Sequence, residues 1–315
     1  MPNPTQSDVH INSPLSNISV AYMQEQDNFI ADKVFPTIPV EKQSDSYFIF
    51  DKGDFLRDEA LPRGDSEESA GSGFRLSNTT YNCQVDAFHK DVGEQVMANA
   101  DAVLNFDVSV TEYVTRKVLL RKDKKFASTF FQTGVWATDS SPATLWDAGT
   151  PSDPAVHVDL AKTTILNSTG YMPNTMVIPW AVLAVLRKSP FIKDQFKYTS
   201  NDSIDDKMIA KYLGLKNLIV AKSVQNTAKE GATSTGASIL GKSALVCYVP
   251  ENPGLMTPSA GYTFAWKGYT KSVDGVRVSR IPVPLKKAER FEVEYASDMK
   301  VIGADLGYFI PAPIS

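Results

Sequence analysis

The fold is decided by GYMPNTMVIPWAVLAVLRKSPFIKD, residues 170–194, and by DSIDDKMIAKYLGLKNLIVAKS, residues 202–223. In the first stretch, the apolar run 176–178 follows a turn-forming Pro-Asn pair and predicts a short buried strand. Pro179 then opens a predicted helix, because proline suits the first helical turn. The apolar face of this helix carries Trp180, Leu183, Ala184 and Leu186, which recur at helical spacing. We expect this stretch to serve packing and not chemistry.

The second stretch predicts another helix followed by another strand. Asp205 and Asp206 suit a helix N-terminus, where the helix dipole favours negative charge. Gly214 is a usual left-handed helix end, and residues 218–221 form a second short apolar run. Together, the two stretches predict a strand, helix, helix, strand unit.

The longest predicted helix covers Ala100 to Phe131, a stretch with no internal Gly or Pro. Its apolar residues recur mainly three or four positions apart: Leu104, Phe106, Val110, Tyr113, Val114, Val118 and Leu119. At 1.5 Å per residue, such a helix is a rod of roughly 45 Å. It also carries a basic run: Arg116, Lys117, Arg121, Lys122, Lys124 and Lys125. We expect this run to form a solvated or ion-paired helix face and not a DNA contact.

A long hairpin is predicted near the N-terminus. Residues 46–55 and 74–85 are rich in strand-forming residues, and about 18 mainly polar residues separate them. Such a connection is unusual inside a compact domain unless it is functional. The predicted strands expose aromatic residues that an isolated monomer should cover, namely Tyr47, Phe48, Phe50 and Phe55. We therefore expect the hairpin to contact a neighbouring subunit.

Charged residues in and near this hairpin could form ion pairs between subunits. The candidates are Lys52, Arg57, Asp58, Glu59, Arg63, Asp65, Glu67 and Glu68. For any one of them, a solvated side chain is an equally good interpretation. Before the hairpin, an N-terminal arm contains Phe29, Ile30, Val34 and Phe35. We expect these apolar residues to dock on other subunits, because a solvated tail gains nothing from them.

The order of these segments resembles the major capsid proteins of tailed double-stranded DNA bacteriophages. The resemblance covers nearly all 315 residues and rests on the order of the elements, not on a signature motif. It implies an α+β phage capsid shell fold with an N-terminal arm (1–40), an extended hairpin (41–86), a peripheral domain with a long spine helix (87–158 and 282–315) and an inserted axial domain (159–281).

The resemblance also implies a function and a set of partners. It implies a structural protein that self-assembles as hexamers and pentamers into the icosahedral head shell of a tailed phage, around the double-stranded DNA genome. The expected location is the virion capsid, with assembly in the host cytoplasm. Implied partners are a portal, a separate scaffold (or none) and decoration proteins. The alternatives are the shell of a bacterial cargo-enclosing nanocompartment and a P-loop nucleotide-binding enzyme.

Composition is consistent with a globular protein that does not grip DNA. With 43% hydrophobic residues, the chain can build one large or two ordinary domains. A net charge of −4 argues against a protein whose task is phosphate neutralisation. The longest apolar run, 176–186, is about half of the roughly 20 residues that a membrane span needs, so no membrane helix is expected. The first residues lack the pattern of a secretory signal.

One motif could indicate an enzyme. Residues 236–243, GASILGKS, match the P-loop expression GxxxxGK[ST]. A phosphate site needs a buried strand before this loop and a helix after it, whose N-terminus faces the phosphates. The residues that follow, ALVCYVPENPG, are strand-like and contain two prolines. A working P-loop is therefore not expected.

Other chemistry is not supported by the sequence. Cys83 and Cys247 are far apart in no metal-ligand spacing, and we expect two buried free thiols. His10, His89 and His157 stand in no catalytic or metal-binding pattern. The sequence therefore predicts a structural protein that is not an enzyme, with no catalytic residue, no cofactor and no metal site.

Overall fold

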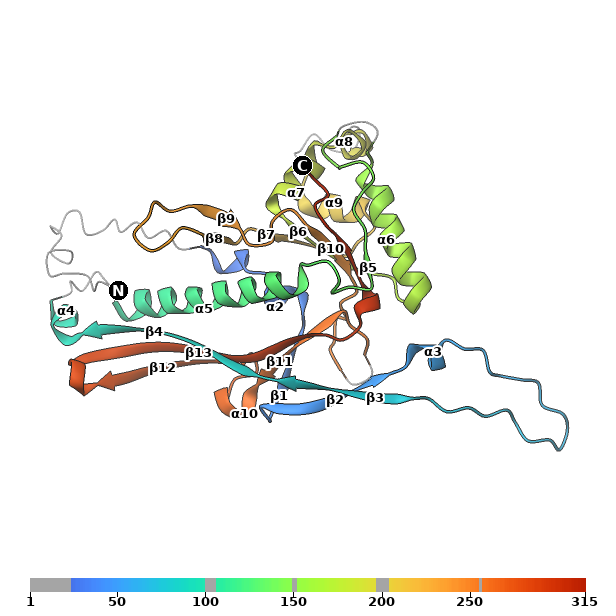
Figure 1. Ribbon diagram of the computed structural model, residues 1–315, viewed down its shortest axis with the longest axis horizontal. Helices are drawn as coiled ribbons and strands as arrows, with labels where there is room; N and C mark the ends of the chain where they lie inside the picture. Colours follow the sequence, from blue (N-terminus) through green and yellow to red (C-terminus); the bar gives the residue numbers. More distant parts are fainter. Residues whose placement is uncertain (1–23, 100–105, 149–151, 197–203, 255–256) are drawn as a thin grey trace.

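A computed structural model describes residues 24–99, 106–148, 152–196, 204–254 and 257–315. The protein contains an elongated sheet with a long helix beside it, a compact sheet flanked by shorter helices, and a hairpin that projects away from both (Figure 1).

The elongated sheet has the order β1-β11-β13-β12, and β4 also pairs with β13. The strands are β1 Thr37–Val40, β4 Gln84–Gly93, β11 Gly261–Trp266, β12 Val276–Val283 and β13 Ala288–Val301. The β13 strand pairs antiparallel with β4, β11 and β12, and it is 14 residues long. At about 3.3 Å per residue it spans roughly 46 Å, so a single strand holds three others in one sheet.

The long helix α5 lies along this sheet (Figure 1) and covers Phe106–Phe130. Its 25 residues give a rod of roughly 37 Å. The predicted helix began at Ala100, and residues 100–105 lie outside the described part of the chain. On the sheet side, Val114 is fully buried in a cluster with Val293 of β13. The predicted spine helix is thus confirmed over its described length.

The basic run on α5 contains ion pairs within the chain, as expected, but one of its members is buried. Arg121 and Lys125 lie 3.8 and 3.7 Å from the Asp86 carboxylate. Lys122 is also paired, with Asp32, but it is only 5% exposed, and its ammonium lies 3.9 Å from the centre of the Tyr295 ring. One member of the predicted solvated face is therefore a core residue.

The arm residues that we expected to dock on other subunits pack in their own chain. The buried residues are Phe29, Ile30, Val34 and Phe35. The Phe35 ring lies 5.2 Å from that of Phe126 and 4.8 Å from that of Phe130, both on α5. The expectation was wrong for these residues, because the short helix α2 (Ala31–Val34) places them against α5 of the same chain.

A buried carboxylate on α5 holds the start of α2. Asp123 accepts hydrogen bonds from the backbone N–H groups of Ile30 (3.1 Å) and Ala31 (2.9 Å), and from the Ser223 hydroxyl (2.9 Å). Burial raises the pKa of Asp123, and the hydrogen bonds from Ala31, Ser223 and Ile30 oppose that rise. This carboxylate therefore joins the arm, the long helix and the segment after β7.

The compact sheet has the order β5-β14-β10-β6-β7. Its strands are β5 Thr138–Asp139, β6 Thr175–Pro179, β7 Asn217–Ala221, β10 Ala244–Cys247 and β14 Gly307–Ile310. Its helices are α6 Pro154–Thr169, α7 Trp180–Lys188, α8 Pro190–Phe196 and α9 Asp206–Tyr212. The β6 and β7 strands pair in parallel, with α7, α8 and α9 between them in the chain. The predicted strands and the two predicted helices are confirmed, and α8 is an additional helix that was not predicted.

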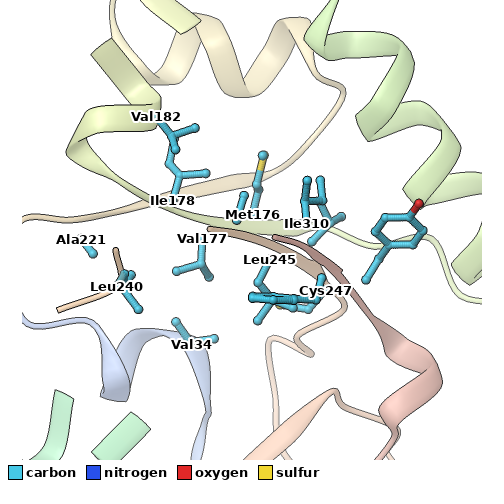
Figure 2. Packing of buried hydrophobic residues seen from close by; sticks show 14 of the residues in the cluster. Val34, Met176, Val177, Ile178, Val182, Ala221, Leu240, Leu245, Cys247 and Ile310 are labelled. Atoms are coloured by element: carbon cyan, nitrogen blue, oxygen red, sulfur yellow. The ribbon is translucent and has the colours of Figure 1, made fainter. Parts of the chain in front are cut away.

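The largest hydrophobic cluster joins this sheet to the arm. All residues of β6 are buried. Figure 2 shows Val34 of α2 on one side of the strands that carry Val177 and Leu245. The compact sheet is therefore not an isolated unit, because it shares its core with α2 and α5.

Two local predictions in this region were wrong. Trp180 is 47% exposed, with Arg187 and Lys222 over its ring at 5.2 and 5.5 Å. The buried face of α7 consists of Val182, Leu183 and Leu186. The other error concerns α6, because the loop-rich composition of residues 133–158 predicts no helix there, whereas α6 begins at Pro154. The Asp153 side chain accepts the Ala155 N–H at 2.9 Å and caps this helix.

The expected domain boundaries differ from the membership of the two sheets. Strands β5 and β14, assigned to the peripheral domain, belong to the compact sheet. Strands β11 and β12, assigned to the axial domain, belong to the elongated sheet. The boundaries at 159 and 281 divide the chain into consecutive segments, whereas these strands are placed by pairing with partners distant in sequence.

The remaining elements are short. They are η1 Gln26–Asn28, α4 Glu94–Ala98, β8 Val224–Asn226, β9 Gly236–Ser238, α10 Lys267–Thr270, η2 Pro284–Lys286 and η3 Ala304–Leu306. The β8 and β9 strands form a separate ribbon. Within the described ranges, no helix combines the length and the apolar composition that crossing a membrane requires.

Candidate interface surfaces

The predicted hairpin is present and projects from the body of the protein (Figure 1). Strands β2 (Ser44–Phe50) and β3 (Leu76–Asn82) pair antiparallel over their whole lengths. The helix α3 (Lys52–Phe55) follows β2, so the first strand is shorter than predicted. No helix or strand occurs between residues 56 and 75, and every residue from 60 to 80 is exposed.

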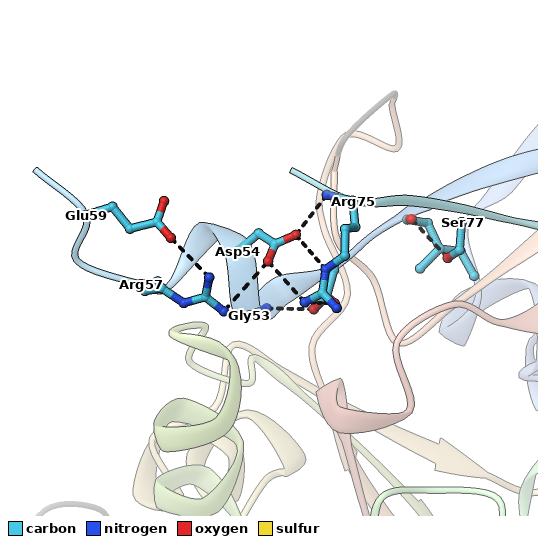
Figure 3. A network of polar contacts seen from close by, with 8 residues as sticks. Gly53, Asp54, Arg57, Glu59, Arg75 and Ser77 are labelled. Atoms are coloured by element: carbon cyan, nitrogen blue, oxygen red, sulfur yellow. Dashed lines mark hydrogen bonds and ion pairs between the residues drawn. The ribbon is translucent and has the colours of Figure 1, made fainter. Parts of the chain in front are cut away.

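The base of the long connection, where it leaves α3 and enters β3, is fixed by a network around Asp54 and Arg75 (Figure 3). The Asp54 carboxylate accepts hydrogen bonds from the Arg75 backbone N–H (2.8 Å), Nε (3.2 Å) and Nη2 (3.1 Å). Arg75 Nη2 also lies 2.7 Å from Asp51. The hydrogen bond from Arg75 lowers the pKa of Asp54, so this carboxylate stays ionised. Both ends of the long connection are thereby held together.

The structure divides the charged candidates into two groups. Near the base, Lys52 pairs with Asp305, and Arg57 lies 3.0 Å from Glu59. These candidates therefore have partners within their own chain.

The second group lies farther out on the hairpin. Glu67 accepts the Gly64 N–H at 3.3 Å. Asp58, Arg63, Asp65 and Glu68 are exposed, and no opposite charge lies within 4.0 Å of them among the described residues.

An apolar patch surrounds the base of the same hairpin. The rings of Phe50, Phe55 and Phe74 lie 5.7 to 6.0 Å apart, centre to centre. The hairpin patch comprises the exposed residues Phe48, Phe55, Leu56, Leu61, Phe74 and Leu76. Tyr47, expected to be exposed, instead lies 5.1 Å from the Phe264 ring. A cluster of exposed apolar side chains on a projection marks an interaction surface.

The P-loop match lacks the structure that phosphate binding needs. Its first residues form β9, and β10 begins at Ala244, directly after the motif. The Lys242 ammonium donates to the carbonyl oxygen of Ser315 at the C-terminus. Because a strand and not a helix follows Ser243, no helix N-terminus faces the loop. The sequence interpretation of this motif is confirmed.

The thiols, histidines and carboxylates also form no reactive site in the described residues. Cys83 and Cys247 are both buried and free, as predicted, and burial raises their pKa values to about 11 and about 12. Of the histidines, His10 lies outside the described residues. Within the described part of the chain, no three or more potential metal ligands lie together.

Known proteins resemble this chain over nearly its whole length. The major capsid protein of Pseudomonas phage JBD67 is 24% identical over 302 residues, covering 95% of this chain and 96% of that protein. A phage-related protein from Bordetella bronchiseptica RB50 has a TM-score of 0.69 at 20% identity, covering 92% and 93% of the two chains. The capsid structure of cyanophage P-SCSP1u gives a TM-score of 0.61 at 11% identity, covering 96% and 93%. No known family profile matches the chain.

These similarities and the elements described above define the class of the protein. The elongated sheet, the long helix, the compact sheet and the projecting hairpin together form the phage capsid shell fold. By fold the chain is of the phage capsid shell class, and in sequence it is similar to the major capsid protein of Pseudomonas phage JBD67 over nearly its whole length.

Proposed function

We infer that this chain builds the icosahedral head shell of a tailed phage, as hexamers and pentamers around double-stranded DNA. The hairpin carries this proposal. Its residues 60–80 are all exposed, and its base displays the hairpin patch. An isolated monomer gains nothing from either feature, whereas lateral contact with a neighbouring copy covers both.

The expected free energy of association is moderate for a single contact and large when the contact is repeated around a shell. Covering one Phe or Leu side chain of the hairpin patch contributes about 1.5–3 kcal/mol at most. Part of that gain is offset by the loss of freedom on association and by ordering of the connection. A closed shell repeats the contact many times, so moderate interfaces suffice for a stable particle.

The charge of the protein fits a container that encloses DNA without sequence-specific binding. The net charge of −4 opposes tight binding to phosphates. On the basic run of α5, Lys122 is buried, and Arg121 and Lys125 lie near Asp86. We place the protein in the virion capsid, assembled in the host cytoplasm with a portal, decoration proteins and either a separate scaffold or none.

Shortening the hairpin tests this function. The variant lacks Arg57 to Gly71 and closes the connection with a short turn. We expect it to fold, because the deleted residues contribute nothing to the described hydrophobic clusters, yet to yield no stable shells. The measurements are circular dichroism and electron microscopy of the particles formed.

The control for this deletion is a similar shortening of another exposed loop. Residues 228–234 connect β8 and β9 and are also mainly exposed. Replacing them with a short turn should leave particle yield unchanged. Normal particles from the hairpin deletion, or loss of its fold, would contradict the proposed role of the hairpin.

A further inference from the structure

A lysine-rich groove lies beside β7, the edge strand of the compact sheet. The groove has a volume of about 660 Å³ and is lined by α9, by the first residues of β7 and by one residue of α2. Its charged lining residues are Lys33, Lys207, Lys211, Lys216 and Asp206. Four ammonium groups and one carboxylate leave a formal surplus of three positive charges in this lysine groove.

This positive charge is only partly neutralised within the chain, because two of the four lysines have carboxylate partners and two have none among the described residues. The Asp206 carboxylate lies 2.8 Å from Arg187, outside the groove lining, so it is already paired. The pairs that Lys33 makes with Asp27 and Lys216 with Glu251 are exposed, and such pairs are weak.

The other two lysines are available to a ligand. Lys207 and Lys211 are exposed, and within the described residues no carboxylate lies within 4.0 Å of them. They stand one helical turn apart on α9, on the same side of the helix. The lysine groove is therefore suited to an acidic partner.

The same chain carries an acidic segment of matching charge. Residues 57–68, the acidic tip, contain five carboxylates and two arginines: Arg57, Asp58, Glu59, Arg63, Asp65, Glu67 and Glu68. The formal surplus is three negative charges. Most of the acidic tip is exposed, and it contains neither helix nor strand, so it can follow the shape of a groove.

The acidic tip and the lysine groove lie on different sides of the protein. In Figure 1, the hairpin extends to the right of the compact sheet, whereas β7 lies on the left of that sheet. The tip therefore meets this groove on another copy and not on its own. A contact between two different surfaces of identical chains is head-to-tail, and it closes into a ring when the rotation between copies permits.

We propose that the acidic tip of one copy docks in the lysine groove of a neighbouring copy. This inference rests on the proposed shell function and assigns the receptor of the hairpin. One tip meets one groove per copy, and three surplus charges face three. Because each copy has one tip and one groove, every groove can be filled by one tip. The number of nucleic-acid phosphates per groove is not fixed in this way, so a second copy of the chain is the favoured occupant.

Charge reversal tests the contact. The groove variant is Lys207→Glu/Lys211→Glu, and the tip variant is Asp65→Lys/Glu67→Lys. Each should fold as wild type by circular dichroism but lower particle yield more than about tenfold, because like charges would then face each other. The combined variant restores opposite charges and should recover particles. The control is Lys188→Glu/Lys193→Glu, which changes the net charge equally on exposed residues of α7 and α8 and should assemble normally.

A second measurement locates the contact directly. A carbodiimide joins an ammonium to a carboxylate that touches it, so wild-type particles should yield peptides linking Lys207 or Lys211 to Asp65, Glu67 or Glu68. Normal yield from both reversed variants, or particles without such links, would overturn this contact and leave the shell function standing.

Two further results would also decide against parts of the proposal. If the wild-type protein forms no particles, the shell function is refuted. The contact between tip and groove can then still be tested, by looking for the same cross-link in concentrated soluble protein. If the wild-type protein binds a DNA duplex, the groove variant does not, and no tip cross-links form, then the lysine groove binds a polyanion. That result would overturn the tip as its occupant.

Discussion

Replacement of Leu183 by alanine tests the packing of the compact sheet. Leu183 is fully buried on α7, which packs against β6 and β7. Removing the equivalent of three methylene groups costs about 2.4 kcal/mol at roughly 0.8 kcal/mol each. The cavity that remains raises the total to about 3–5 kcal/mol, because a parallel pair of strands below the helix relaxes little.

That cost is large against the stability of an ordinary domain, about 5–15 kcal/mol. Thermal unfolding of the soluble, unassembled subunit, followed by circular dichroism, should show a melting temperature lower by about 5–10 °C. Much of the expressed variant should also be insoluble, because a larger fraction of the chain is unfolded.

Two controls lie on the same helix. Trp180→Ala removes a larger side chain, yet Trp180 is 47% exposed and should cost less than about 1.5 kcal/mol. Lys188→Ala, on the exposed face, should be nearly neutral. An unchanged melting temperature for Leu183→Ala, or a larger loss for Trp180→Ala, would refute the described packing of α7.

Three other changes give distinct results. Lys242→Ala should leave assembly unchanged, because β10 follows the P-loop match directly. ATP hydrolysis by the wild-type protein that is lost in this variant would contradict that. Gly307→Ala should destabilise the protein by at least about 1–3 kcal/mol in the same thermal assay, because its new Cβ would overlap the Trp136 ring. The hydrogen bond from Arg290 lowers the pKa of Asp91, so this carboxylate stabilises the folded state above its unfolded pKa of about 3.9 and loses that effect as pH falls. The difference in melting temperature between wild type and Asp91→Asn should therefore shrink as pH falls below about 5 and keep shrinking below about pH 3, because the folded-state pKa of Asp91 lies well below its unfolded value. A constant difference would contradict this.

The sequence by itself determined the local elements of this protein. The apolar periodicity between residues 106 and 130 defined the long helix, and the apolar runs in 170–194 and 202–223 defined β6, α7, α9 and β7. Two strand-rich segments separated by a polar connection placed the hairpin, and the strand-like residues after 243 argued against a P-loop. Each of these depends on neighbours within a few residues, which is the range over which propensity and periodicity act.

More could have been taken from the pattern of α5. Val110, Val114 and Val118 recur every four residues on the buried face, and the next position in that series is Lys122. The spacing thus marks Lys122 as inward-facing, although its charge favoured the solvated interpretation. Its neighbour Asp123, also missed, is buried as well and accepts hydrogen bonds from Ile30, Ala31 and Ser223.

Only the tertiary structure decided which segments meet. The arm packs on α5 of its own chain because Asp123 holds the start of α2, a pairing across more than 90 positions. The sheets combine strands from distant parts of the chain, because β13 and β10 each pair with strands that are far away in sequence. Charges on the acidic tip and in the lysine groove are visible in the sequence, but their separation onto different sides of the molecule is not. These relations depend on long-range strand pairing and burial, which local residue patterns do not encode.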